Sequence, residues 1–145
     1  MEELPTEFVT ELYKQTAFLS AVLGGFAISF AGVLLTLASE NKTISRTIWI
    51  ASFAAISLIL ATFSSTVVLL DLIRLEITNF NFADWPASTL KSKAIADYSF
   101  FAGMYALVIA IGFSGKIRDK KTGIVTAILA AIGLMLLTVV LWSTR

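Results

Sequence analysis

The amino-acid sequence predicts an all-α integral membrane protein: four antiparallel transmembrane helices in a single domain, residues 1–145, assembled as a homo-oligomer. Four long stretches of the chain are apolar and free of charge. Hydrophobic residues make up 57% of the sequence and charged residues 14%, whereas charged residues are about a quarter of a soluble domain. The mean hydropathy is +0.86. The expected spans are residues 16–39, 47–70, 93–115 and 122–144.

The first span, residues 16–39, is 24 residues long. As a helix it measures about 36 Å, which is enough to cross a ~30 Å hydrocarbon core with some tilt. On a helical wheel its small residues form two stripes. The first stripe is Ala21, Gly25, Ser29, Gly32 and Thr36. The second stripe is Thr16, Ser20, Gly24, Ala27, Ala31 and Ala38, and the bulky residues gather on a third face.

Two stripes of small residues allow other helices to approach this span from two sides, because small side chains let backbones meet closely in a membrane. One interpretation is that both stripes pack within a single bundle. The other is that one stripe packs within the subunit and the other faces a neighbouring subunit or a pore.

The segment before the first span, residues 1–15, has the pattern of a short amphipathic helix. Leu4, Phe8 and Leu12 recur every four residues, and Glu7 and Glu11 lie on another face. Such a segment can lie in the membrane interface or can extend the first helix.

The second span, residues 47–70, follows a short polar loop. Its most polar patch is Ser64-Ser65-Thr66, whose hydroxyls are expected to bond to the preceding turn of their own helix. Its small residues form one stripe, consisting of Ala51, Ala54, Ala55, Ala61, Thr62 and Ser65.

The longest connection, residues 71–97, carries a compact set of charges that we interpret as a structural ion-pair belt at the headgroups. Ser88 or Thr89 is expected to cap the helix that follows, and Asp97 is expected near Lys93, one turn earlier. The belt consists of Asp71, Arg74, Glu76, Lys91, Lys93 and Asp97.

The third and fourth spans are joined by the short basic loop KIRDKK. Tyr105 is the one titratable side chain deep in a span, and its hydroxyl is expected to find a carbonyl. Each span has a stripe of small residues: Ser99, Ala102, Gly103, Ala106 and Ala110 in the third, and Gly123, Thr126, Ala130 and Gly133 in the fourth.

The orientation predicted for the membrane rests on a small difference between the numbers of basic residues on its two sides. Five lie on the side of the termini and six on the other side. The dense KIRDKK loop favours the second side as cytoplasmic, which places both termini outside a plasma or inner membrane.

Several function classes have little support in the composition. The chain has no cysteine and no histidine, which removes thiolate and imidazole chemistry and the usual zinc ligands. No constellation of nucleophile, base and oxyanion donors is recognisable, so we expect no enzyme, no cofactor and no metal. The uncharged cores of the four spans offer no proton relay, and the few basic residues beside the spans argue against nucleic acid.

Residues 21–27, AVLGGFA, form a run of small and apolar side chains within the first span. This run resembles the start of the pore helix in the Orai family of calcium channels, where a similar run ends in Ser-Gly-Phe-Ala. The general layout is also similar, with four spans, a short first loop and a longer helical second connection. The resemblance implies an oligomer whose first helices line a central pore.

The chain departs from the Orai pattern in three ways. Val33 stands where the resemblance would place the selectivity carboxylate, and the basic third loop is far shorter. Orai termini are also cytoplasmic, opposite to the orientation expected above. The resemblance therefore implies a pore-like layout without calcium selectivity.

The function expected from the sequence is a small homo-oligomeric membrane protein that forms a pore or ion channel lined by the first span. The alternative is an accessory or scaffold subunit that packs against a larger membrane partner. In both cases the surrounding partner is the lipid bilayer.

Overall fold

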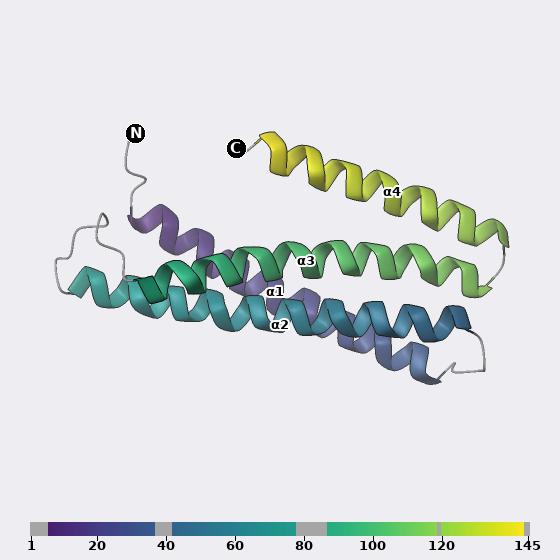
Figure 1. Cartoon of the computed structure of the whole chain (residues 1–145), viewed down its shortest axis with the longest axis horizontal. Helices are drawn as coiled ribbons and strands as arrows, with labels where there is room; N and C mark the ends of the chain where they lie inside the picture. Colours follow the sequence, from purple (N-terminus) through teal and green to yellow (C-terminus); the bar gives the residue numbers. More distant parts are fainter. Residues whose placement is uncertain (1–5, 37–41, 78–86, 119, 144–145) are drawn as a thin grey trace.

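The computed structural model describes residues 6–36, 42–77, 87–118 and 120–143, and these residues form four α-helices (Figure 1). They are α1 (Thr6–Thr36), α2 (Lys42–Ile77), α3 (Ala87–Arg118) and α4 (Lys120–Ser143). Consecutive helices run in opposite directions (Figure 1). Within these ranges, all four helices are long and apolar enough to cross a membrane. The all-helical, four-span prediction is confirmed to that extent.

Helices α1 and α3 begin well before the spans predicted from the sequence. Helix α1 is continuous from Thr6, so residues 6–15 of the amphipathic segment extend the first helix, and residues 1–5 lie outside the described residues. Helix α3 begins at Ala87, well before the predicted start at Lys93. A helix of 31 residues is about 46 Å long, which exceeds the thickness of a ~30 Å hydrocarbon core. Residues 37–39 and 144, at two predicted span ends, lie outside the described residues.

Helix α2 is the centre of the bundle. It packs against α1 on one side and α3 on the other, while α1 and α3 touch only slightly. Figure 1 shows α1 crossing α2 and α3 obliquely, with α4 lying along α3. At the crossing the buried core is mostly alanine: Ala27 of α1, Ala54, Ala55 and Leu58 of α2, and Ala106 and Leu107 of α3.

Two glycines bring the backbones together at this core. A Cβ added to Gly24 of α1 would lie 3.4 Å from Leu58 Cβ. A Cβ added to Gly103 of α3 would lie 2.6 Å from Leu58 Cγ and 3.2 Å from the Ala54 carbonyl oxygen. Leu58 thus fills the space that the two glycines leave, which is how small residues hold membrane helices at close range.

Helix α4 is peripheral. In the described part of the chain it contacts α3 alone. Of its most apolar 18-residue stretch only 6% is buried, against 44% for α2. Its small residues face α3: a Cβ on Gly112 would lie 2.8 Å from Ala130 Cβ, and a Cβ on Gly115 would overlap the Thr126 side chain. Most of the α4 surface is therefore left for lipid or for another protein.

Hydroxyl groups inside the helices mostly bond within their own helix. Thr66 Oγ1 donates to the Thr62 carbonyl at 2.9 Å, as expected from the sequence. Tyr105 differs from its prediction, because its hydroxyl bonds to Thr138 Oγ1 of α4 at 2.8 Å and not to a carbonyl. Ser65, in the same predicted patch as Thr66, differs from the prediction, because its Oγ is buried without a hydrogen-bond partner among the described residues.

Candidate functional site

The first stripe of α1 faces away from the rest of the chain. We call Ala21, Gly25, Ser29, Gly32 and Thr36 the outward stripe, because all five are exposed. A Cβ added to Gly25 or Gly32 would meet nothing within 4 Å. The described helices therefore leave this face of α1 open along its whole length.

The second stripe of α1 has the opposite environment. Ser20, Gly24, Ala27 and Ala31 are buried, and Gly24 and Ala27 pack against α2 at Leu58 and its neighbours. Thr16 is half-buried, and Ala38 lies outside the described residues. One small-residue face of α1 is thus used within the chain, and the other is not.

The outward stripe carries two hydroxyl groups, those of Ser29 and Thr36, and no charged side chain. Ser29 Oγ donates to the Gly25 carbonyl at 3.0 Å, and Thr36 Oγ1 donates to the Val33 carbonyl at 2.7 Å. Their protons are committed to the helix, so the hydroxyl oxygens remain on the surface as acceptors. A row of uncharged acceptors between small side chains can contact a neighbouring helix or a hydrated cation, but it cannot act as a carboxylate ring.

A bulky face borders the outward stripe. Val22, Phe26 and Val33 are exposed, and Phe26 and Phe30 are stacked, with ring centroids 6.5 Å apart. Large apolar side chains suit contact with lipid tails, whereas small ones suit close contact between helices. Helix α1 therefore presents two different outer surfaces side by side.

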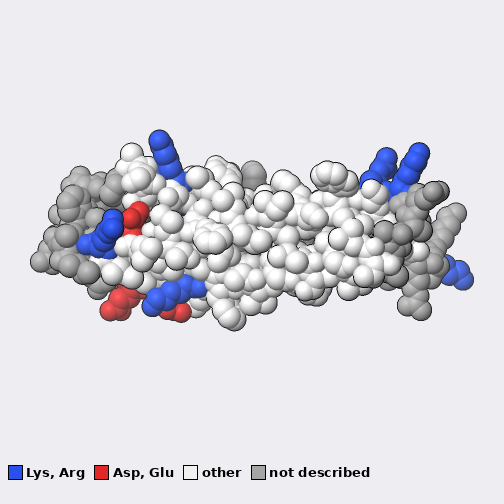
Figure 2. All heavy atoms as spheres, turned by 90° about the horizontal axis from the view of Figure 1, so that it is seen from below, with Lys and Arg blue, Asp and Glu red and all other residues white. Residues whose placement is uncertain are grey.

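The charged residues of the predicted belt lie at one end of the bundle, the end that Figure 2 shows on the left with both red and blue atoms. Asp71 of α2 is half-buried, and Thr89 Oγ1 of α3 donates a hydrogen bond of 2.8 Å to Asp71 Oδ2. Thr89 is the third residue of α3, so neither it nor Ser88 precedes the helix as an N-cap residue would. Its hydroxyl joins two helices, which corrects the capping prediction.

The second carboxylate of the belt, Asp97, joins α3 to α1. It is half-buried, receives a hydrogen bond from the Tyr13 hydroxyl, and lies within electrostatic range of Lys93, as expected. Tyr13 itself is buried with Val68, Leu72 and Ala96. The structure therefore uses both carboxylates to tie helices together at this end.

The remaining belt residues lie nearer the surface. Arg74, Lys91 and Lys93 are exposed, and the side chain of Glu76 lies outside the described residues. The arrangement favours a structural role for the belt, since its two described carboxylates are partly buried against hydroxyl partners.

The sequence patterns above do not single out Tyr13, and they give Thr89 only as a possible helix cap, not as a partner of Asp71. A signal for Tyr13 exists: it lies seven residues before Ser20 and fourteen before Ala27, on the same helical face as the buried stripe. Thr89 has no comparable signal, because its partner lies 18 residues away across a connection.

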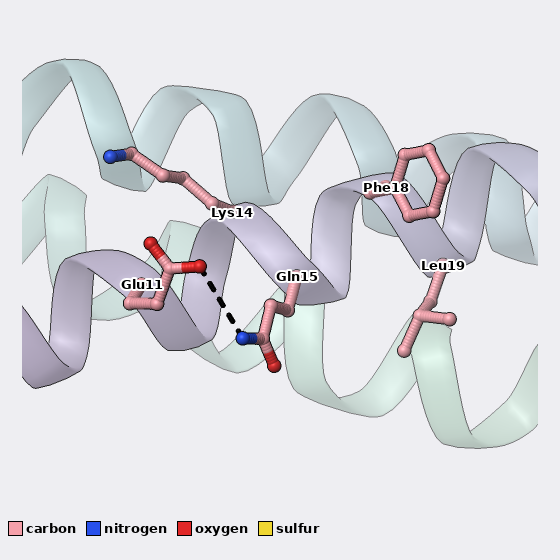
Figure 3. A pocket seen from close by; sticks show the side chains of 5 residues that line it. All are labelled: Glu11, Lys14, Gln15, Phe18 and Leu19. Carbon is pink, nitrogen blue, oxygen red and sulfur yellow. Dashed lines mark hydrogen bonds between the residues drawn. The ribbon is translucent and has the colours of Figure 1, made fainter.

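A shallow surface hollow lies on α1 just before the apolar stretch. Figure 3 shows its walls, formed by Glu11, Lys14, Gln15, Phe18 and Leu19. Gln15 Nε2 donates to Glu11 Oε1 at 3.3 Å, one turn back. Charged side chains therefore lie next to Phe18 and Leu19 at the start of the first predicted span.

The described residues bring no three His, Cys, Asp or Glu side chains together as a metal site. Comparisons of the chain with protein-family models, with curated proteins and with solved structures found no match. The candidate site therefore rests on the geometry of α1.

Proposed function

We propose that the protein is a homo-oligomeric membrane pore in which the outward stripe of α1 lines the axis. The observation that supports this most is the contrast between the two stripes: one is buried against α2, and the other is exposed with nothing within 4 Å of its glycines. Small residues on an open face of a membrane helix favour close approach by another helix. In a ring of identical subunits that approach would bring several copies of α1 together.

The composition of the stripe supports a particular kind of pore. Gly25 and Gly32 leave room at the axis, and Ser29 and Thr36 add oxygen acceptors. The stripe has no carboxylate, so nothing in it selects divalent cations, and gating would come from dewetting of a narrow apolar stretch. The resemblance of the AVLGGFA run to the Orai pore helix points to the same layout.

Cysteine substitution in this cysteine-free chain tests the proposal. We expect the wild type to conduct in planar bilayers. A charged, membrane-impermeant thiol reagent should block Ser29→Cys, whose side chain lies on the outward stripe. The matched control is Val22→Cys, which is equally outside the bundle but on the bulky face and should be insensitive.

A charge substitution gives an independent measurement. Gly32→Asp would place a ring of carboxylates at the axis and should shift the reversal potential towards cation selectivity.

Equal reagent sensitivity at Ser29→Cys and Val22→Cys would contradict the lining assigned here. Absence of current from folded, inserted protein would favour the accessory-subunit function.

Disruption of the stripe also tests assembly. At one depth Gly25 can either line the axis or lie at a close contact between subunits. In the second case, Gly25→Leu should reduce the oligomer measured by size-exclusion chromatography in detergent, because a side chain would enter the space where the backbones meet. Phe26→Leu, on the bulky face, should leave the oligomer intact.

A further inference from the structure

A groove of about 180 Å³ runs along the outer seam between α3 and α4. It is lined by small residues, including Gly112, Ala127 and Ala131, and by larger ones, including Phe113 and Leu134. Ala127 and Ala131 are exposed, so the groove opens away from the bundle. In a membrane this opening faces lipid, because α4 touches no described helix besides α3.

One end of the groove carries a positive charge. Lys116, which lines that end, is exposed, and its Nζ lies 5.2 Å from the centroid of the Phe113 ring. Its backbone is held against α4: a Cβ added to Gly123 would lie 3.0 Å from Lys116 Cα. The close contact between the helices therefore places the ammonium group at the groove, near the end of α3.

The groove has a direction. Ile109, at its other end, lies seven residues before Lys116 on α3, which corresponds to about 10 Å along the helix axis. The charged end coincides with the end of a candidate span, Ala87–Ile117. The groove thus runs from headgroup depth into the hydrocarbon, with the lysine outermost.

The surroundings of Lys116 are electropositive. Two stretches of the sequence near Lys116 or near the start of α2 are rich in basic residues. Together, residues 37–47 and 116–121 contain six Lys and Arg and two Asp and Glu. Among the described side chains this end carries Lys42, Arg46, Lys116 and Lys121, whereas every described Asp and Glu lies towards the opposite end. Figure 2 shows this asymmetry, with red atoms confined to the left.

We propose that this groove binds a phospholipid with an anionic headgroup, whose phosphate contacts Lys116 and one of whose acyl chains lies in the groove. Basic pockets between transmembrane helices are where acidic headgroups bind. The apolar lining matches an acyl chain, and the cation at the outer end of the groove matches the phosphate. This site is on α3 and α4 and does not depend on the pore proposed for α1.

Native mass spectrometry from detergent micelles tests the proposal. The probes are phosphatidylglycerol and phosphatidylcholine with identical acyl chains, together with inorganic phosphate. We expect phosphatidylglycerol to bind about fivefold more tightly than phosphatidylcholine, as expected for one lysine. Inorganic phosphate should not compete, because it lacks the chain that fills the groove.

Two variants and one control assign the binding to the groove. Lys116→Gln should remove the preference for phosphatidylglycerol, and Ala131→Phe should weaken both lipids by filling the groove. Lys42→Gln removes one charge from the same end of the bundle, but on α2, and should keep the preference. Thermal unfolding of each variant confirms that the bundle is intact.

Other results would overturn the site. If Lys42→Gln and Lys116→Gln lowered the preference equally, the attraction would come from the general charge of this end. If Ala131→Phe bound lipid like the wild type, the groove would not hold the chain. Loss of dimers in Ala131→Phe, without a change in bound lipid, would assign the groove to a second copy of the protein.

Discussion

At the scale of single residues, the surroundings of similar side chains decide their roles. Gly24 and Gly25 are neighbours in the sequence, yet Gly24 lies against Leu58 and Gly25 has nothing within 4 Å. Thr66 and Thr89 are both helical, yet Thr66 donates to its own helix and Thr89 donates to Asp71 of another. The helical wheel separates such residues by angle, but it does not say which angle faces a partner.

The hydrogen bond between Thr89 and Asp71 predicts a measurable loss of stability. Thr89→Val keeps the shape and the helix propensity but removes the donor to a half-buried carboxylate. We expect the free energy of unfolding in detergent to fall by about 1–2 kcal/mol. Ser88→Ala, at an exposed neighbouring position, is the control and should change stability little. A similar loss in both variants would show that the bond contributes nothing specific.

At the scale of helices, the packing order α1–α2–α3–α4 follows from where small residues meet large ones. Leu58 of α2 fills the space beside Gly24 of α1 and Gly103 of α3. Helix α4 joins the bundle through glycines of α3 and through the bond between Tyr105 and Thr138. Because lipid tails are as apolar as leucine, close backbone approach and hydroxyl bonds determine these contacts.

Substitutions of two glycines test this packing directly. In Gly103→Ala the new methyl group would meet Leu58, which is fully buried and cannot move aside. We expect the free energy of unfolding to fall by about 1–3 kcal/mol from overpacking. Gly25→Ala adds the same methyl group to an open face, and alanine should raise helix stability there by up to about 1 kcal/mol. Thermal unfolding that ranked the two variants in the opposite order would contradict the arrangement of α1, α2 and α3.

At the scale of the whole molecule, the ends of the bundle differ in charge. The belt end combines Asp71 and Asp97 with Lys91 and Lys93, and its carboxylates are bound by hydroxyls of other helices. The opposite end carries basic residues among its described side chains. Such asymmetry gives a membrane protein different surroundings in the two leaflets, since anionic lipid attracts basic segments.

Single cysteines test the membrane topology. Ser45, at the start of α2, and Ser88, at the start of α3, are both exposed and lie at opposite ends of the bundle. We expect Ser45→Cys and Ser88→Cys to react with an impermeant maleimide from opposite sides of sealed vesicles. The side that reaches Ser45→Cys also tests the orientation expected from the basic loop. Labelling of both from one side would be incompatible with four spans.

The number of candidate spans and the positions of their apolar cores follow from the amino-acid sequence, because apolarity is a property of contiguous residues. The helix starts do not follow from it, since α1 and α3 begin before those cores. The sequence also determined which faces carry small residues, since a helical wheel needs only the 3.6-residue period. Both stripes of α1 and the stripe of α2 therefore follow from the order of residues alone, as does the absence of charge from the outward stripe.

Which stripe of α1 is buried and which is open follows from the packing of the helices. Two stripes of similar small residues are equally able to pack, and the choice depends on how α1 is rotated against Leu58 of α2. The same holds for the hydroxyl partners of Asp71 and Asp97 and for the position of α4 on α3 alone among the described helices. These contacts join residues far apart in the chain, and their geometry depends on the crossing angles and rotations of whole helices, which local sequence patterns do not contain.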